Sequence, residues 1–148
     1  MADSAPPIEP SPSDPPFEPT ERLYRRIPRA DVEARAISDA SIPSPAFSVD
    51  REKYRPNPAD MLIEHAGHGI AAFRVRDIPA SLASDDGRLY EFGVEYRPLE
   101  ENRAHSEVHS YQEGVRLDDV GREPPKHVRK KLRDLLRRKM EILELERR

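Results

Sequence analysis

The hydrophobic pattern of the chain is most regular between Tyr90 and Tyr111. In the first half of this stretch, aromatic or apolar residues alternate with polar ones and form one face, made of Tyr90, Phe92, Val94 and Tyr96. The second half, residues 104–111, alternates small or apolar residues with polar ones, and residues 97–102 separate the two halves. Because neighbouring side chains of a strand point to opposite faces, this pattern predicts a half-buried hairpin of two strands.

Shorter segments before this hairpin have the patterns of further strands and helices. Residues 21–27, 46–49 and 70–75 have the alternation or apolar content of short strands. Residues 29–39 have the spacing of a short helix, and Asn57 followed by Pro58 is typical of a helix start. Strands mixed with short helices predict one small α+β domain over residues 21–111, with a mixed or antiparallel sheet, and then a linker over residues 112–125.

Apolar residues recur at helical spacing after Pro124 and Pro125, and no glycine or proline interrupts them. The pattern predicts a long basic amphipathic helix over residues 126–148. Its apolar face consists of Val128, Leu132, Leu135, Leu136, Met140 and Leu143. Glutamates near its end oppose the helix dipole, so we expect packing against other parts of a protein to hold this helix; they are Glu141, Glu144 and Glu146.

The other side of this helix is basic and suggests three interpretations. Its cations include Arg129, Lys130, Arg133, Arg137 and Arg138. The leucines can pack on the domain of the same chain, which leaves the arginines in solvent. The apolar face can instead dock to a protein partner or to a second copy of the chain, or the arginines can neutralise the phosphates of a nucleic acid. No Trp or Phe lies on the apolar face, so we expect no membrane contact.

Proline and charge are distributed unevenly along the 148 residues. Seven of the 16 prolines lie within the first 19 residues, which lack apolar periodicity, so residues 1–20 are predicted to be a disordered arm. From Lys126 to Arg148 the chain carries ten basic and four acidic residues, a net charge of +6, so the remaining residues carry −9 of the total of −3. An acidic body is thus joined to a basic C-terminal segment.

Two absences in the sequence exclude whole classes of protein. Without cysteine the chain forms no disulfide, and it has neither a thiolate nucleophile nor a cysteine-ligated metal. No apolar run approaches the roughly 18 residues of a membrane span, and the N-terminal residues lack the pattern of a signal peptide. We therefore expect a cytoplasmic protein.

The second strand of the predicted hairpin also carries the densest group of titratable side chains. His105, Glu107 and His109 fall on one face of it. Two imidazoles can act as general base and general acid near neutral pH, while Arg25 holds a phosphate. This set favours a small nuclease. Further candidates for its site are Arg97, Tyr96 and Tyr111.

Metal binding and ADP-ribosyl transfer use parts of the same set. Metal binding is disfavoured, because alternate strand residues lie about 7 Å apart and the pattern HxExH differs from the helical motif HExxH. We therefore expect neither a metal nor a cofactor. Arg25, Ser48 and Glu107 follow the order arginine, serine, glutamate of small NAD-consuming folds, which leaves ADP-ribosyl transfer as another alternative.

Four blocks of the sequence resemble blocks in a group of small uncharacterised bacterial proteins, where they occur in the same order. The blocks are LYRRI from Leu23, PAFSVD from Pro45, HAGHGIAAF from His65 and VEYRPLEENRAHSEV from Val94. The resemblance covers about residues 23–109 and implies one compact domain without a function. That group has NPAHA around the position of His105, whereas this chain has no proline there.

Taken together, these patterns favour a protein-interaction module, a subunit or adaptor of a bacterial assembly that docks through its basic C-terminal helix. The proline-rich arm, the uneven charge and the lack of a defined catalytic motif support this hypothesis. The alternatives are a small nuclease or nucleic-acid-binding protein that acts through His105 and His109, and an ADP-ribosyl-transfer-like fold.

Overall fold

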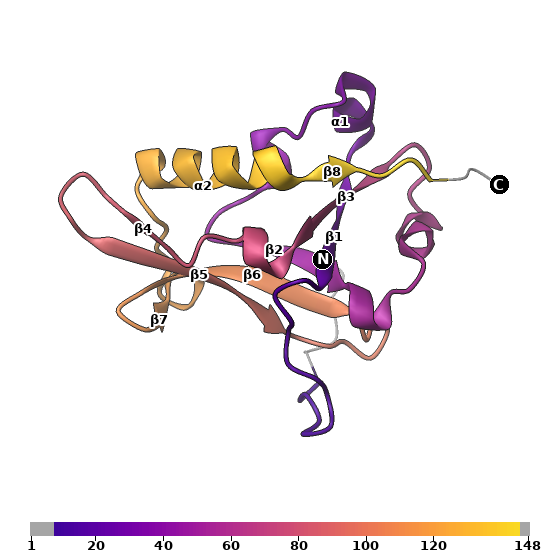
Figure 1. The fold of residues 1–148 in the computed structure, drawn as a ribbon, viewed down its shortest axis with the longest axis horizontal. Coiled ribbons are helices and arrows are strands. Elements are labelled where there is room, and N and C mark those ends of the chain that lie inside the picture. Colours follow the sequence, from indigo (N-terminus) through magenta and orange to yellow (C-terminus); the bar gives the residue numbers. More distant parts are fainter. Residues whose placement is uncertain (1–7, 146–148) are drawn as a thin grey trace.

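A computed structural model describes residues 8–145, and its centre is one antiparallel sheet (Figure 1). The sheet has eight strands: β1 (Arg22–Ile27), β2 (Ala46–Arg51), β3 (Gly69–Arg74), β4 (Ser81–Ala83), β5 (Leu89–Tyr96), β6 (His105–Gln112), β7 (Val115–Arg116) and β8 (Glu141–Ile142). The strand order is β4-β5-β6-β2-β1-β3-β8, and β7 pairs with β6. The predicted α+β class and the predicted hairpin, now β5 and β6, are confirmed.

Short helical segments connect the strands, and one longer helix covers the sheet. The α-helices are α1 (Arg29–Ala34) and α2 (Lys126–Lys139), and the 3-10 turns are η1 (Asp39–Ser41), η2 (Glu52–Tyr54), η3 (Pro58–Leu62), η4 (Val75–Asp77) and η5 (Leu117–Val120). The helix predicted over residues 29–39 ends early because Arg35 adopts a left-handed conformation, with φ of 51°. Asn57 caps η3 as predicted, since its side chain accepts a hydrogen bond from the N–H of Ala59.

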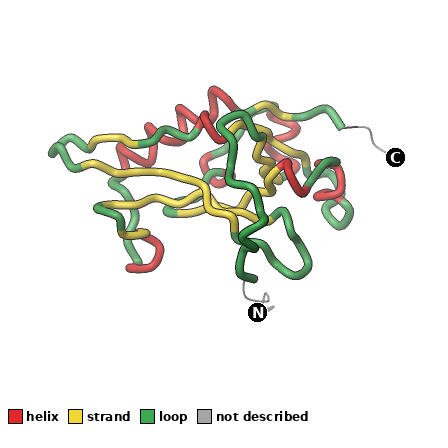
Figure 2. Tube along the Cα trace, turned by 60° about the horizontal axis from the view of Figure 1, so that its bottom comes forward, coloured by secondary structure: helices red, strands yellow, loops and turns green. Residues whose placement is uncertain are grey.

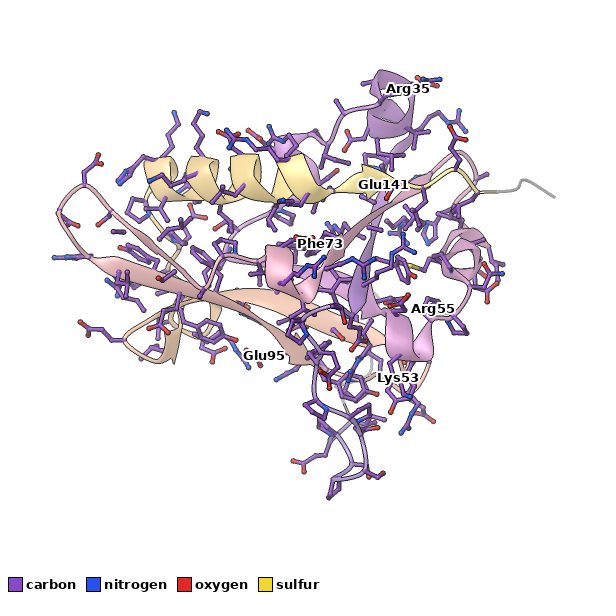
Figure 3. All side chains as sticks on the ribbon, viewed as in Figure 1. Arg35, Lys53, Arg55, Phe73, Glu95 and Glu141 are labelled. Carbon is purple, nitrogen blue, oxygen red and sulfur yellow. The ribbon has the colours of Figure 1, made fainter. Side chains whose placement is uncertain are left out.

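The main core lies between α2 and one face of the sheet. Val128, Leu132 and Leu136 of α2 are buried there against strand residues such as Phe47 and Phe73. Figure 3 shows Phe73 on the side of the sheet that faces α2. Burying a leucine of this kind contributes about 1.5–3 kcal/mol. Helix α2 is therefore part of the domain, and Val128, Leu132 and Leu136 offer no surface to a partner, which contradicts the predicted partner-binding face.

The residues predicted to form a linker, 112–125, also pack on the domain. They contain β7 and η5, and the side chains of Leu117 and Pro124 are buried. Leu117 belongs to the same core cluster as the residues of α2. The chain thus continues from β6 to α2 without a free linker.

Helix α2 is shorter than the predicted helix over residues 126–148. It ends at Lys139, Met140 is extended, and β8 pairs with β3. The N–H of Leu143 then donates to the carbonyl of Ile70 at 2.9 Å. An early end places basic residues in the last helical turn, which agrees with the helix dipole, and leaves Glu141 and Glu144 outside the helix. Residues 146–148 of the predicted helix lie outside the described residues.

Residues 8–20 contain no helix or strand but lie against the sheet, where the sequence predicted a free arm. Arg51, only 1% exposed, binds both carboxylate oxygens of Glu21 and donates to the carbonyl of Pro15. Its guanidinium also lies 4.1 Å from the ring centroid of Phe17. A buried cation needs such partners, and the proline-rich segment supplies them through its carbonyls and its one aromatic ring. The rest of the predicted arm, residues 1–7, lies outside the described residues.

The sheet is strongly curved (Figure 2), and its two faces carry different side chains. On the face away from α2, a smaller cluster of Tyr24, Ile70 and Ala72 packs against Met61 and Leu62 of η3. The rest of this face, over β2 and β6, is polar. Within residues 8–145, none of the helices has the length and apolar character needed to cross a membrane.

Candidate functional site

The sheet splits between β1 and β2. Strand β1 pairs with β3 at all six of its positions, and β2 pairs with β6 from Ala46 to Asp50. The ladder between β1 and β2 contains only the pairs Leu23–Arg51 and Tyr24–Asp50. Beyond Tyr24 the two strands diverge, so a gap opens in the middle of the sheet.

The side chain of Arg25 bridges this gap. Its Nε donates to the carbonyl of Ser41 and its Nη1 to the carbonyl of Ser48, both at 3.0 Å. No contact within residues 8–145 gives Arg25 a carboxylate partner. Burial lowers the pKa of Arg25 below its usual value, and the charge of Arg26 lowers it further. The group stays a cation, and an anion beside it would be stabilised.

A cleft of about 440 Å³ opens at the gap, on the face away from α2. One wall is the sheet, with Arg25 and Arg26 from β1, Ser48 from β2 and His105 from β6. The opposite wall is the segment from Asp60 to His65. The remaining lining residues are Val49, Asp50, Arg55 and Asn102. The volume lies in the usual range for small-molecule sites, about 300–1,000 Å³.

Ser48, His105 and Glu107 share one polar face beside the cleft. Ser48 is directly opposite Glu107, and Asp50 is directly opposite His105. Directly opposed side chains have Cβ atoms about 5 Å apart. Glu95 of β5 is directly opposite Glu107, so the two side chains lie on the same face of the sheet. Figure 3 shows Glu95 on the side of the sheet away from α2.

Glu107 is held as a carboxylate by His109. The His109 Nε2 and Glu107 Oε1 atoms lie 2.7 Å apart, and because a carboxylate only accepts, Nε2 carries the proton. This hydrogen bond lowers the pKa of Glu107 below its usual value, although partial burial opposes it, and the charges of His105 and Arg97 act in the same direction as the bond. Glu107 is therefore ionised at neutral pH.

The structure separates the two histidines that were predicted to act as an acid–base pair. His105 lines the cleft, whereas His109 is 2% exposed and is bound to Glu107. The Nδ1 atom of His109 is buried and has no partner among the described residues. Of the two predicted histidines, the structure therefore places His105 and not His109 at the cleft.

The other candidates of the predicted nuclease site are engaged elsewhere. Arg97 offers its carbonyl to His105, and its Nε is buried without a partner in the described part of the chain. The hydroxyl of Tyr96 donates to the carbonyl of Arg103. Tyr111 donates to Glu95, and burial together with this carboxylate raises the pKa of the Tyr111 phenol. None of the three lines the cleft.

The wall from Asp60 to His65 and the nearby Arg26 and Arg55 were missed from the sequence. His65 lies close to Arg26, with 2.5 Å between its Nε2 and the arginine Nη1. Arg55 pairs with Asp50 at 3.0 Å. The apolar residues Met61 and Leu62 give a local signal for packing, but the strand they pack on is set by contacts between distant residues. No local pattern reveals such a wall.

The basic row of α2 is largely bound to its own chain. Arg129 donates to the carbonyl of Pro124, Arg133 donates to the carbonyl of Ile42, and Arg137 pairs with Asp39. Lys130 pairs with Asp134 of the same helix, and Arg138 is exposed. The apolar residues Leu135 and Met140 are half-buried. Arg133 and Arg137 thus fix α2 to the segment that precedes β2, whereas Arg129 binds the residues just before the helix.

Two further observations bear on function. Among residues 8–145, no group of three or more His, Asp or Glu side chains has the arrangement of a metal site. Comparisons with models of protein families, with curated proteins and with solved structures found no match for this chain.

Proposed function

We propose that this protein consumes NAD, and that it breaks the bond between nicotinamide and ribose in the cleft between β1 and β2. One observation carries the proposal: Arg25 and Ser48, which are far apart in the sequence, line the same cleft, and Glu107 lies beside it, directly opposite Ser48. Arg25 donates to the carbonyl of Ser48, and Ser48 is directly opposite Glu107. The order arginine, serine, glutamate is that of small NAD-consuming folds, and a shared location is the arrangement that such chemistry requires.

The cations of the cleft suit a substrate with phosphates. Arg25 is half-buried, lies next to the exposed Arg26 and has no carboxylate partner within the described residues. A diphosphate placed here would pair with the exposed guanidinium of Arg26, and the charge of Arg25 at the gap would add to the attraction. A charge-assisted hydrogen bond is about twice as strong as a neutral one. The far wall, with Asp60 and Glu64, supplies acceptors for ribose hydroxyls.

The carboxylate of Glu107 suits the reaction. As the bond to nicotinamide breaks, positive charge develops on the ribose, and a fixed anion beside it lowers the energy of the transition state. The hydrogen bond from His109 both ionises Glu107 and fixes its orientation. This fixed carboxylate stabilises the transition state, and the reaction needs no general acid, because nicotinamide leaves as a neutral molecule.

The other hypotheses from the sequence lack this support. The interaction module was expected to dock through the apolar face of α2, which is buried in the core of the same chain. The nuclease needed His109 at the substrate, and His109 is enclosed. A cytoplasmic location remains our proposal and agrees with an NAD-consuming activity, because NAD is an intracellular metabolite.

The test is whether the full chain releases nicotinamide from NAD, with the released nicotinamide measured by chromatography. At about 1 mM NAD, the upper end of usual KM values, we expect the wild-type protein to release nicotinamide and the variant Glu107→Gln to be about 10²–10³-fold slower. Glu91→Gln is the matched control, because Glu91 is an exposed glutamate on β5. A wild-type protein that releases no nicotinamide from NAD or NADP refutes the proposal, as does full activity in Glu107→Gln.

A further inference from the structure

His105 keeps one ring nitrogen available to the cleft, and its hydrogen bonds identify which one. Its Nδ1 lies 2.8 Å from the carbonyl oxygen of Arg97. A carbonyl only accepts hydrogen bonds, so Nδ1 carries the proton. In the neutral ring the lone pair is therefore on Nε2, which faces Ser48 across 3.4 Å. That separation is longer than a normal hydrogen bond between a hydroxyl and an acceptor, so a hydroxyl in the cleft can replace Ser48 at Nε2.

Several other titratable groups around the cleft are already engaged, whereas the carboxylates of Asp60 and Glu64 lie on the wall opposite the sheet. Asp50 pairs with Arg55 at 3.0 Å and accepts from Asn102 at 2.9 Å. His65 lies on the opposite wall, and its Nε2 contacts Arg26. Glu107 is held by His109. Of the basic groups on the sheet wall of the cleft, His105 is the one with a free acceptor nitrogen.

We infer that His105 is the general base that activates the acceptor of the ADP-ribosyl group, and that this acceptor is a hydroxyl, with water as the simplest case. The inference rests on the proposed NAD-consuming function and adds the class of acceptor to it. A base is needed only where the acceptor must lose a proton, so a histidine in this position selects water or a hydroxyl over an acceptor that carries no proton.

The proposed step balances without a further reactant. The bond between C1′ of the ribose and the nicotinamide nitrogen breaks, and its electron pair leaves with nicotinamide. The acceptor oxygen bonds to C1′ as its O–H bond breaks, and the proton moves to Nε2 of His105. The resulting imidazolium keeps the hydrogen bond from its Nδ1 to the carbonyl of Arg97. The proton then passes to solvent.

Two reactions of the same full-length protein separate a base from a positioning residue. Hydrolysis of NAD needs a deprotonated water, whereas exchange of nicotinamide for 3-acetylpyridine does not, because the pyridine nitrogen has no proton to lose. In His105→Asn we expect hydrolysis to fall by about 10²–10⁴-fold and exchange to stay within about threefold of the wild-type rate. The amide of asparagine keeps a donor for the carbonyl of Arg97, which preserves the local hydrogen bond.

Three further measurements make the result decisive. His105→Gln should behave as His105→Asn does, and exogenous imidazole should raise hydrolysis, but not exchange, in His105→Ala. His127→Gln, a change in an exposed histidine on α2, should leave both rates unaltered. If hydrolysis and exchange are lost equally, or if hydrolysis survives in both His105→Asn and His105→Gln, the role of His105 is refuted. The NAD-consuming function still stands in either case. A wild-type protein that performs neither reaction refutes both.

Discussion

Replacing Glu21 by glutamine tests how strongly the N-terminal segment is fixed to the sheet. The side chains of Arg51 and Glu21 are 1% and 9% exposed, and the carboxylate also accepts from the N–H of Lys53 at 3.1 Å. Removing one charge of a buried ion pair costs about 3–5 kcal/mol, because the other charge stays buried without compensation. Arg51 would keep the carbonyl of Pro15 and the ring of Phe17, so we expect the lower end, about 3 kcal/mol.

The assay is urea unfolding of the full chain, read as the free energy of unfolding. A loss of about 3 kcal/mol is a large part of the 5–15 kcal/mol usual for a folded domain, so the transition should move clearly. Glu18→Gln is the matched control. Because Glu18 is exposed, this substitution should change the free energy of unfolding by no more than about 0.5 kcal/mol. Combining Glu21→Gln with Arg51→Met should recover much of the stability. A loss below about 1 kcal/mol in Glu21→Gln would show that the pair does not fix the segment.

Two other changes test the packing and the electrostatics. Leu136 is 0% exposed, so Leu136→Ala should lower the free energy of unfolding by about 2–5 kcal/mol and the half-buried Leu135→Ala by less; equal small effects would place α2 outside the core. Burial raises the pKa of Asp31, but hydrogen bonds from Ser41 and Ser38 outweigh it and leave the pKa below its usual value of 3.8. This carboxylate therefore stabilises the fold above its unfolded-state pKa, and the contribution disappears as the pH falls through the lower folded-state pKa. Asp31→Asn should accordingly reduce the difference in urea midpoint between neutral pH and about pH 3, and an undiminished difference would contradict the assignment.

The elements that the sequence predicted well are those fixed by local patterns. The alternation from Tyr90 to Tyr96 gave β5, and Asn57 with Pro58 marked the start of η3. The length of α2 was predicted wrongly, because Leu143 continues the helical spacing although it packs on the opposite face of the sheet from Leu136. A local pattern cannot distinguish a leucine that continues a helix from one that leaves it to pair with a distant strand.

The site was predictable as residue types but not as an arrangement. The face shared by His105 and Glu107 follows from strand alternation, and the order of Arg25, Ser48 and Glu107 is visible in the sequence. The cleft that Arg25 and Ser48 line depends on β1 and β2 diverging after two pairs, which is set by the pairing of each strand with its other neighbour. The enclosure of His109 depends on the same pairing, and for this reason the sequence could not separate the two histidines.

The place of α2 and β8 in the sheet affects how the chain folds during synthesis. Strands β1 to β6 leave the ribosome first, with Phe47, Phe73 and Val108 still uncovered on one face. Their cover, α2, and the strand that closes the edge of β3 come from the last part of the described chain. At 5–20 residues per second, the roughly 30 residues from the end of β6 to β8 take about 2–6 s to synthesise. During those seconds the nascent chain exposes a β-rich apolar surface, and we expect it to depend on chaperones at this stage more than at any other.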